Sequence, residues 1–499
     1  TGFNGSLAPL MAAKAAEVQA DIINLGKLTA GKLVLEGNNL SIIGADSLDV
    51  VDKSQITLRA NENINIGYEV TDKTTINVGD GQGNTYQVSD YGKGGGTKAS
   101  DVLSGASVTD LIGGAKSIND AMLVHDVYEL QAIDRNTSLV NGSSYVVGNY
   151  MLAGDIEAEV TKNWNSGRGF ESIGNFYRPY TGEDPTGGFA GIFDGGSYSI
   201  KNLYIKKIEN YDTGYIGLFD CIAKGAVVSN INMAGGHIEA VSSFGSIAGL
   251  NWGTIHNVVN SAELVSKGGF VGGIVGTNGG LIRDAVNNGE LNIYGNSGGI
   301  AGVNGDTVWN NTGTLVNVKN TGNINSFEMG NIGGVVGTNS KNGTIKFAEN
   351  TAKVELTDSG GSSVGGISGS NYGLMENLKN SGTIVGYVYS DNTMGVSCVG
   401  GIVGENDSSG IVRNAENFGT VSGDNTIGGI AGSNEEGVLE EVKNLSGTVT
   451  SKGMSVGGVT GYNTGKIKDS CNNAVINCGT IYAGGIAGSN GTGNLKGSI

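Results

Sequence analysis

The chain has 499 residues, of which 89 are glycine and three are proline, and its 30 basic and 47 acidic residues give a net charge of −17 at pH 7. Glycine far exceeds its usual share of about 7%, yet no proline follows Pro185, which suits a hydrogen-bonded strand ladder and disfavours a collagen-like or disordered chain. We find no basic stripe for nucleic acid, no membrane-spanning apolar run and no signal peptide. The sequence stops within a repeat, so we expect a trimmed or mature piece of a longer precursor.

Residues 1–120 predict an N-terminal β-solenoid. From Ile22 to Val70, apolar and polar residues alternate between glycine and asparagine breaks, and this period of two is typical of short strands. Residues 7–19, "LAPLMAAKAAEVQ", predict either a short helix that caps the first coil or a further strand.

Residues 121–215 predict a loop-rich insertion that covers the stack. The stretch "LVHDVYELQAI" from Leu123 has a helical apolar pattern, whereas Lys162–Gly188 gathers aromatic residues and two prolines with few strand signals. Strand signals resume at "FAGIFDGGSYSIKNLYI", and a degenerate first repeat begins at Tyr215. We expect the aromatic residues of this insertion to pack within it: Trp164, Phe176, Tyr177 and Tyr180.

Residues 216–499 repeat the phrase "GGI-x-G-x-N" at intervals of 26 to 35 residues. A second asparagine follows most copies by nine to eleven residues, and the length variation falls between these fixed points. Such behaviour is typical of a solenoid whose insertions leave through loops. The first asparagines are Asn251, Asn278, Asn304, Asn339, Asn371, Asn406, Asn434, Asn463 and Asn490, and the second are Asn260, Asn287, Asn320, Asn350, Asn380, Asn417, Asn444 and Asn472.

The segments between the asparagines predict strands. They are short and β-branched, and none from residue 240 onward keeps a helical period for twelve residues. A repeat of this length holds two or three strands, which is one coil of a parallel β-helix that rises about 4.8 Å to the next coil. Asparagine tolerates the left-handed backbone of a corner and can hydrogen-bond its copies above and below, so we predict that both sets form structural ladders.

Three side-chain positions carry further expectations. Residues equivalent to Ile274 are isoleucine or valine in all nine repeats and are predicted to stack inside; residues equivalent to Thr277 vary and are predicted to face solvent. Ile282 and Ala285 lie three apart in the next strand. A flat strand cannot point both inward, so a bend or bulge is expected between them.

The repeats resemble a known family. "VGGIVGTN" looks like the GLUG motif, and "VHDVYELQAI", "YMLAGDIEA", "FESIGN" and "FAGIFDGGSYSIKNLYI" look like the leader that precedes such repeats in large bacterial surface proteins. Residues 22–70 are similar to repeats of filamentous-haemagglutinin-type exoproteins of two-partner secretion. The resemblance implies a right-handed parallel β-helix, an outer-membrane export partner, and adhesion or assembly at the cell surface.

Candidate ligand-binding residues are aromatic and lie in the longest excursions between ladder points. Trp309 follows Asn304, and Tyr387 and Tyr389 follow Asn380; such side chains stack on sugars or anchor a protein partner, although loop aromatics also fold back on the stack.

Catalysis and metal binding are less well supported. The carboxylate pairs Asp155 with Glu157, Glu405 with Asp407 and Glu440 with Glu441 are candidates for glycan cleavage, but each is more simply a solvated pair, and Asp194 is more simply a turn residue. The three histidines lack metallopeptidase spacing. We therefore expect no catalytic residue, no metal and no cofactor, and either free thiols or a local bridge at Cys471 and Cys478.

These patterns favour an extracellular, non-enzymatic β-solenoid that acts as a surface adhesin. Its partners would be a host or matrix glycan or protein, or a ligand on a neighbouring cell. A subunit that assembles with its like into a filament or surface lattice is the first alternative. A polysaccharide-degrading β-helix enzyme is the second.

Overall fold

Short β-branched segments form short strands throughout the computed structural model. It describes strands between Ser6 and Val88 and residues 121–124, 126–135, 137–140, 143–174, 176, 186–209, 214–305, 311–357, 362–386, 398–479 and 481–498. The fold is an all-β parallel β-solenoid of about nine turns with a loop-rich N-terminal region, which confirms the predicted parallel β-helix. The chain divides into two units, Thr1–Lys206 with Ala226–Gly236, and Lys207–Gly225 with His237–Ile499.

The strands before residue 90 form small sheets. Strands β2, β5 and β7 pair in parallel, as do β3, β6 and β8, whereas β9 and β10 are antiparallel. The described parts of residues 7–19 are strands, in agreement with the strand alternative. The bounds are β1 (Ser6–Leu7), β2 (Leu10–Ala12), β3 (Ala16–Gln19), β4 (Asn24–Leu25), β5 (Lys27–Ala30), β6 (Leu33–Ile42), β7 (Ser47–Val50), β8 (Ile56–Ile66), β9 (Ile76–Gly79) and β10 (Thr85–Val88).

The rest of the first unit contains the predicted helix and further parallel pairs. Helix α3 (Val127–Ala132) begins where Asp126 Oδ1 accepts hydrogen bonds from the N–H groups of Tyr128 and Glu129 at 2.9 and 2.8 Å. Strand β14 pairs in parallel with β11 and β16, and β21 pairs with β16 and β17. The bounds are β11 (Met122–Val124), β12 (Thr137–Val140), β13 (Ser143–Val146), β14 (Asn149–Leu152), β15 (Ile156–Glu157), β16 (Ile192–Asp194), β17 (Ser199–Lys201), β18 (Tyr204–Lys207), β21 (Val227–Ala234), η2 (Ile133–Arg135), η3 (Glu159–Asn163) and η4 (Asn165–Gly167).

Trp164 belongs to the interior of this unit, as predicted. Its side chain is buried, and its ring lies 5.2 Å from the Tyr128 ring and 6.5 Å from the Phe170 ring, measured between centroids. Phe176 is half-buried, and Tyr177 and Tyr180 lie outside the described residues.

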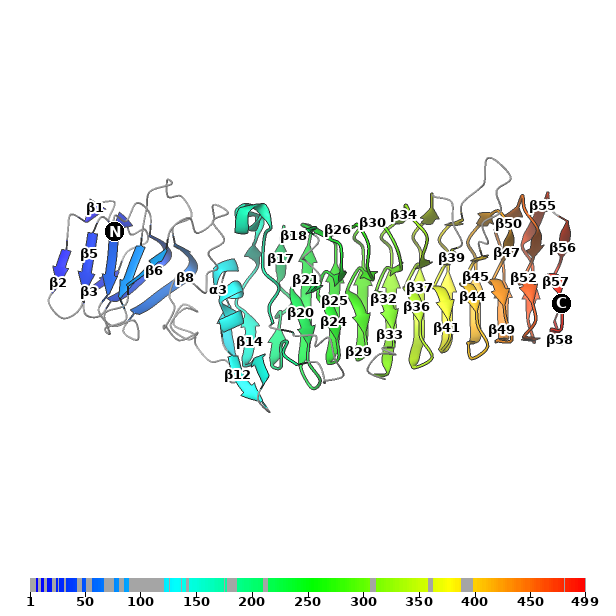
Figure 1. Ribbon diagram of the computed structural model, residues 1–499, viewed down its shortest axis with the longest axis horizontal. Coiled ribbons are helices and arrows are strands. Elements are labelled where there is room, and N and C mark those ends of the chain that lie inside the picture. The colour runs from blue at the N-terminus through cyan, green and yellow to red at the C-terminus, as the bar shows by residue number, and fades with distance from the viewer. Residues whose placement is uncertain are drawn as a thin grey trace. The chain divides into compact units, whose positions relative to one another are not determined.

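In the second unit each full coil contributes to each of four parallel sheets, which we number S1 to S4 in chain order (Figure 1). S1 comprises β19 (Tyr215–Ile216), β23 (Ser243–Gly245), β27 (Val271–Gly272), β31 (Ser297–Gly298), β35 (Asn331–Gly333), β39 (Ser363–Gly365), β43 (Cys398–Gly400), β47 (Thr426–Gly428), β51 (Ser455–Gly457) and β56 (Tyr482–Gly484). S2 comprises β20 (Phe219–Ile222), β24 (Ala248–Asn251), β28 (Val275–Asn278), β32 (Ala301–Asn304), β36 (Val336–Asn339), β40 (Ser368–Asn371), β44 (Val403–Asn406), β48 (Ala431–Asn434), β52 (Thr460–Asn463) and β57 (Ala487–Asn490).

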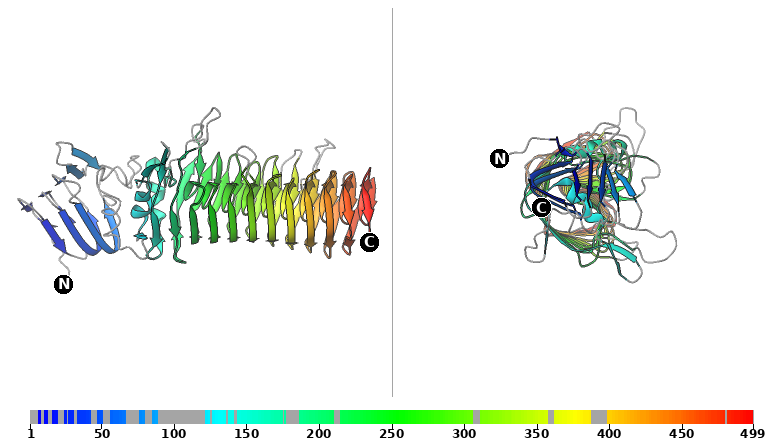
Figure 2. Two further views of the ribbon diagram at one scale, coloured as in Figure 1. Left: turned by 90° about the horizontal axis from the view of Figure 1, so that it is seen from below. Right: turned by 90° about the vertical axis from the view of Figure 1, so that its left-hand side faces the viewer.

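The other two sheets complete each coil, and successive coils superpose from residue 237 onward (Figure 2). S3 comprises β25 (Thr254–Asn260), β29 (Leu281–Asn287), β33 (Gly313–Asn320), β37 (Gly343–Asn350), β41 (Leu374–Asn380), β45 (Ile411–Asn417), β49 (Val438–Asn444), β53 (Lys466–Lys468) with β54 (Cys471–Asn472), and β58 (Asn494–Lys496). S4 comprises β22 (His237–Ala240), β26 (Glu263–Ser266), β30 (Leu291–Ile293), β34 (Ile324–Ser326), β38 (Val354–Leu356), β42 (Ile384–Val385), β46 (Val421–Gly423), β50 (Thr448–Ser451) and β55 (Val475–Cys478).

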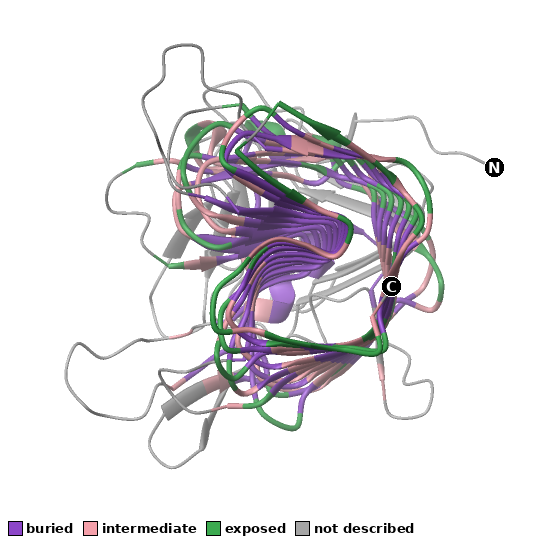
Figure 3. Ribbon diagram, turned by 90° about the vertical axis from the view of Figure 1, so that its right-hand side faces the viewer, coloured by how far each residue is buried: buried purple, intermediate pink, exposed green. Residues whose placement is uncertain are grey.

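Equivalent apolar positions of successive repeats stack in the core, where buried segments of successive coils overlie one another (Figure 3). The side chains equivalent to Ile274 are fully buried in eight coils and half-buried at Ile486. Burial of each side chain of this size stabilises the folded state by about 1.5–3 kcal/mol relative to leaving it exposed. The eight are Ile247, Ile274, Ile300, Val335, Ile367, Ile402, Ile430 and Val459.

The prediction that the Thr277 position faces solvent is wrong for three coils, in which Leu250, Ser370 and Ser433 are buried. The position is half-buried in five coils and exposed at Tyr462, at 37%. This side of S2 lies against the first residues of S1 strands, because Ser243 Oγ is 3.2 Å from Thr277 Oγ1 and Ser363 Oγ donates to Glu405 Oε2 at 3.2 Å. The position is thus partly covered by a neighbouring strand of the same solenoid.

The bend predicted between Ile282 and Ala285 is present. The pairing of β25 with β29 matches Ile255 to Ile282 and Val258 to Ala285 but skips Asn257 and Asp284, and both Ile282 and Ala285 are fully buried. The skipped residue has left-handed backbone, with φ between 49° and 59°, and it is usually asparagine or aspartate. Its members in the second unit are Asn257, Asp284, Asn317, Phe347, Asn377, Asn414, Glu441 and Asp469.

Phe347 is the member of this column least suited to its backbone, and Phe347→Asn is expected to raise the free energy of unfolding by about 1 kcal/mol. The φ of 55° is unfavourable for a bulky residue, and the side chain is 57% exposed, so little packing is lost. Urea unfolding followed by circular dichroism would measure the gain. Phe270→Asn is the control, since Phe270 is 41% exposed but is not among the left-handed residues; an equal gain there would contradict the backbone argument.

Candidate functional site

The predicted asparagine positions form two hydrogen-bonded rows along the second unit. In both rows the side-chain Nδ2 of each asparagine donates to Oδ1 of its counterpart in the next coil. All but the last member of each row are fully buried. The first row, from Asn251 to Asn490, has donor–acceptor distances of 2.8 or 2.9 Å. The second row, from Asn260 to Asn472, has distances of 2.8 to 3.0 Å.

Most rungs also close a corner of their own coil. Asn287 Nδ2 donates to the carbonyl of Gly289 at 3.0 Å, and Asn287 Oδ1 accepts from the N–H of the same glycine at 3.3 Å. The amide thereby uses both donors and both acceptor sites, as a buried asparagine requires. The core of the solenoid is therefore fixed by side-chain amides as well as by backbone ladders.

Corner length varies at the first row. The Nδ2 group of Asn278 reaches a glycine carbonyl two residues later, that of Asn339 one four residues later, and that of Asn304 one nine residues later. In the second row the spacing is two residues from Asn260 through Asn417. Extra residues therefore leave the coil between S2 and S3 while the rung stays in place.

The predicted ligand-binding aromatics belong to two connections between strands. Trp309 lies in the connection from β32 to β33, and Tyr387 and Tyr389 lie in the connection from β42 to β43, outside the described residues. Their binding role stays a prediction.

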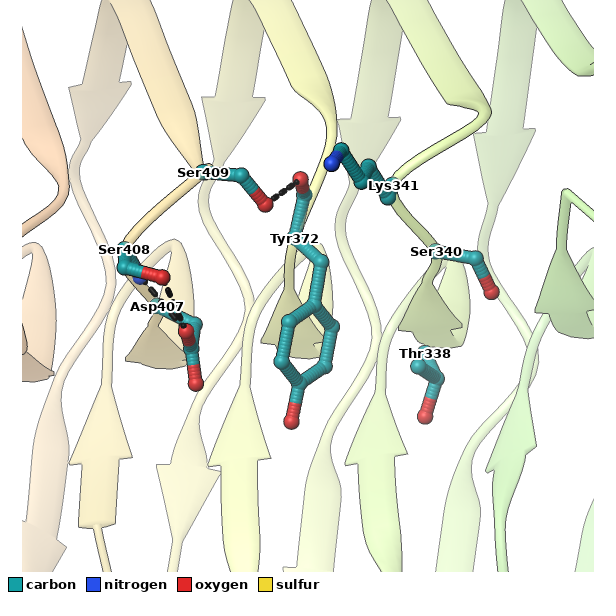
Figure 4. Close-up of a pocket in the computed structure, with 7 residues that line it drawn as sticks. All are labelled: Thr338, Ser340, Lys341, Tyr372, Asp407, Ser408 and Ser409. Carbon is teal, nitrogen blue, oxygen red and sulfur yellow. Dashed lines mark hydrogen bonds between the residues drawn. The ribbon is translucent and has the colours of Figure 1, made fainter. Parts of the chain in front are cut away.

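A groove instead lies where corners of unequal length adjoin. The corners after Asn339 and Asn406 are long, and each forms a turn closed by a hydrogen bond of 2.7 Å, from Gly343 N to Ser340 O and from Gly410 N to Asp407 O. The corner after Asn371, between them, is short and presents Tyr372. The resulting cavity, of about 510 Å³, is lined by Thr338, Ser340, Lys341, Tyr372, Asp407, Ser408 and Ser409 (Figure 4).

The backbone ladder holds these residues. Tyr372 N donates to Asn339 O at 2.8 Å, and Asp407 N donates to Asn371 O at 3.0 Å. Ser409 Oγ bridges one turn to the floor by donating to Tyr372 O at 2.6 Å, as Figure 4 shows. The half-buried Tyr372 side chain therefore lies between two polar walls that cannot shift without breaking the coil.

Carboxylates dominate the electrostatics around Tyr372. Burial and the charges of Glu405, Asp407 and Glu435 raise the pKa of the Tyr372 phenol, so the hydroxyl stays protonated. Burial and the nearby Glu435 also raise the pKa of Glu405. Burial, and to a lesser extent the charges of Glu405 and Glu435, raises the pKa of the Cys398 thiol to about 12. The thiol is therefore an unreactive core residue.

The other carboxylate candidates are neutralised by cations or occupied in turns. Asp155 and Glu157 each lie 3.1 Å from Lys201 Nζ, and hydrogen bonds from Ser199 N–H and Lys201 lower the pKa of Asp155. Lys468 and Arg413 lower the pKa of Glu440, whereas a general acid needs a raised pKa. Asp194 Oδ1 accepts from Gly196 N at 2.9 Å and Asn230 Nδ2 at 2.8 Å, as a turn residue does.

The four cysteines all belong to the second unit. All four cysteines are free thiols, so Cys471 and Cys478 form no bridge. Among the described residues, no three histidine, cysteine or acidic side chains gather as a metal site. None of the described helices is long and apolar enough to cross a bilayer.

The sequence analysis did not predict the groove, although the corner sequences differ where it forms. The corners read "NSKNG", "NYG" and "NDSSG" in three successive repeats. The sequence prediction rests on aromatics in the longest loops, whereas Tyr372 directly follows a ladder asparagine in a short corner. The difference in corner length between neighbouring repeats is the signal that marks the groove.

Comparisons with known proteins find similar stretches but show no family for this chain. No protein-family model matches the chain, so the resemblance to GLUG repeats and haemagglutinin exoproteins has no family match behind it. Over 159 residues, 32% of its length, the chain is 30% identical to halomucin of Haloquadratum walsbyi, and this stretch spans 2% of halomucin. A crystal structure of a Bacteroides ovatus protein, provisionally assigned as an immunoglobulin A1 protease, matches 66% of this chain and 76% of its own at 18% identity and a TM-score of 0.35.

Proposed function

We propose that the chain is an extracellular, non-enzymatic β-solenoid of a cell surface that binds ligands of a host, of the matrix or of neighbouring cells. The observation that carries the proposal is the separation between an invariant core and variable corners. The asparagine rungs keep one geometry. The corner that follows each first-row asparagine varies, because the glycine carbonyl that the asparagine contacts lies two to nine residues later, and corners of unequal length build the Tyr372 groove. Binding residues on loops above a rigid scaffold are a common arrangement for recognition.

The absence of enzymatic activity is part of the proposal. Two of the three carboxylate pairs lie beside lysine or arginine, which favours ionised carboxylates and works against a general acid. The pair of Glu405 and Asp407 keeps the enzyme alternative open, because the pKa of Glu405 is raised. Neutral and uronic-acid polysaccharides should keep their viscosity during incubation with the purified chain, and a fall that Glu405→Gln abolishes would favour the enzyme.

Adhesion predicts that beads coated with the folded chain attach to cells or extracellular matrix. Beads coated with heat-denatured chain should not attach, because the corners require the rungs beneath them. Flow-chamber counts would measure attachment, and negative-stain images of the same preparation would show separate molecules. Ordered polymers without bead attachment would instead favour the self-assembling subunit.

A further inference from the structure

We propose that the Tyr372 groove binds one or two sugar rings of an uncharged glycan, which lie on the tyrosine between the two turns. The proposal rests on the adhesive function proposed above and gives it a ligand class. The groove is built from Thr338, Ser340 and Lys341 on one side, Tyr372 at the floor, and Asp407 to Ser409 on the other side.

The dimensions of the groove suit a single saccharide chain. Its walls belong to coils on either side of the Asn371 coil, so their backbones are separated by two axial rises, roughly 9–10 Å. Figure 4 shows the Tyr372 ring between Thr338 on one side and Asp407 on the other. A chain that follows the ring would run across the stack, confined by a turn on each side.

The lining combines an apolar surface with polar edges. A sugar ring presents C–H groups on its faces and hydroxyl groups at its rim, so an aromatic floor and hydrogen-bonding walls complement it. Ser340 and Ser408 contribute hydroxyl groups, and Asp407 Oδ1 is held by Ser408 N and Ser408 Oγ at 2.6 and 3.0 Å. Within the described residues Asp407 Oδ2 and Lys341 Nζ make no hydrogen bond or ion pair, which leaves an acceptor and a donor on opposite walls.

Charge selects against anionic polymers. Glu405, Asp407 and Glu435 all act on Tyr372, and Lys341 is the one cationic residue in the lining. A polyuronate or sulfated chain would therefore meet like charges at short range, which costs binding free energy. An uncharged glycan avoids this repulsion and still satisfies the hydroxyl groups of the walls.

A polypeptide fits this lining less well. Protein partners are usually anchored by large side chains in dry apolar pockets. Here the apolar contribution comes from Tyr372 and the Thr338 methyl group, and the other five lining residues are serine, aspartate and lysine. The groove offers no enclosed apolar site for such an anchor.

A glycan array followed by biolayer interferometry on the full chain tests the proposal. We expect uncharged oligosaccharides to bind and uronic-acid or sulfated ones to bind at least tenfold more weakly. Tyr372→Ala should weaken binding at least tenfold, whereas Tyr372→Phe keeps the ring and should stay within about threefold. Tyr462→Ala is the matched control, because Tyr462 is an exposed S2 tyrosine outside the groove.

The outcomes separate this inference from adhesion itself. Unchanged glycan binding by Tyr372→Ala, preferential binding of anionic chains, or binding to proteins alone would overturn the proposal, even if coated beads still attach to cells. If beads coated with the unaltered chain do not attach to cells or matrix, the adhesive function is overturned instead. Equal urea midpoints for the three variants and the unaltered chain would establish that each one is folded.

Discussion

Asn350→Ala should lower the free energy of unfolding by about 4 kcal/mol, because it leaves several buried polar groups without partners at once. Asn350 Oδ1 accepts from Asn320 Nδ2 at 2.9 Å and from Ala352 N at 3.3 Å, and Asn350 Nδ2 donates to Asn380 Oδ1 at 2.9 Å and to Ala352 O at 3.1 Å. All three asparagines of this segment are fully buried, so water cannot replace the lost amide without entering the core. Urea unfolding monitored by circular dichroism would measure the loss.

Asn325→Ala provides the comparison on the outer face of S4. Its Nδ2 donates to Glu290 and Asn292 at 2.8 and 3.0 Å, but the residue is partly exposed, so water can take over these contacts. We expect a change within about 0.5 kcal/mol. Comparable losses at Asn325 and Asn350 would mean that the ladder contributes nothing beyond surface hydrogen bonding.

Asn350→Asp separates hydrogen bonding from packing, because the two side chains have nearly the same shape. An ionised aspartate would direct acceptors at Asn380 Oδ1 and Ala352 O, which are acceptors themselves. Burial raises the pKa of such a carboxyl group in the folded state. The folded state therefore binds the proton more tightly, and the stability deficit should shrink as the pH falls from 7 towards about 4. A deficit independent of pH would contradict this account.

Gly401→Ala should lower the free energy of unfolding by about 3 kcal/mol through overpacking. A Cβ atom at Gly401 would lie 2.5 Å from Asn417 Cγ and Nδ2 and closer still to the carbonyl oxygen of Gly429. Asn417 is itself a rung, bonded to Asn380 and Asn444 at 2.8 and 3.0 Å, so it cannot move aside without breaking the row. The second glycine of the repeated phrase thus makes room for the asparagine ladder.

Gly485→Ala is the matched control for this prediction. Gly485 occupies the same place in the phrase, but a Cβ atom there would meet nothing within 4 Å. Without a clash, replacing glycine with alanine restricts the unfolded chain and should be neutral or stabilising by up to about 1 kcal/mol. Urea unfolding midpoints of both variants would test the clash. A loss of stability in Gly485→Ala as large as in Gly401→Ala would point to a backbone effect in place of the clash.

Much of the fold could be predicted because a repeat reports the same environment many times. The Ile274 position is isoleucine or valine in every copy, which a single coil would not have distinguished from chance, and the spacing of Ile282 and Ala285 required the bend that the structure contains. The burial of the Thr277 position at Leu250, Ser370 and Ser433 was not predicted, because the variability of the position indicated solvent. Burial there comes from an S1 strand that packs on S2, and such a contact leaves no period in the sequence.

The candidate site was harder to predict for a related reason. A groove depends on the difference between neighbouring corners, whereas alignment of repeats emphasises what they share. Ser340, Tyr372 and Asp407 each directly follow a rung asparagine in their own coils, and only their stacking makes them one surface.

The amide rows also give the second unit an electrical direction. From Asn251 to Asn490 each asparagine directs one side-chain N–H towards the next coil, and its side-chain carbonyl accepts from the previous coil. An amide carries a dipole of about 3.5 D, and aligned amides add as they do in an α-helix. Strand backbones alternate and largely cancel, so these side chains leave a partial positive pole at the Asn490 end of the row and a partial negative pole at the Asn251 end.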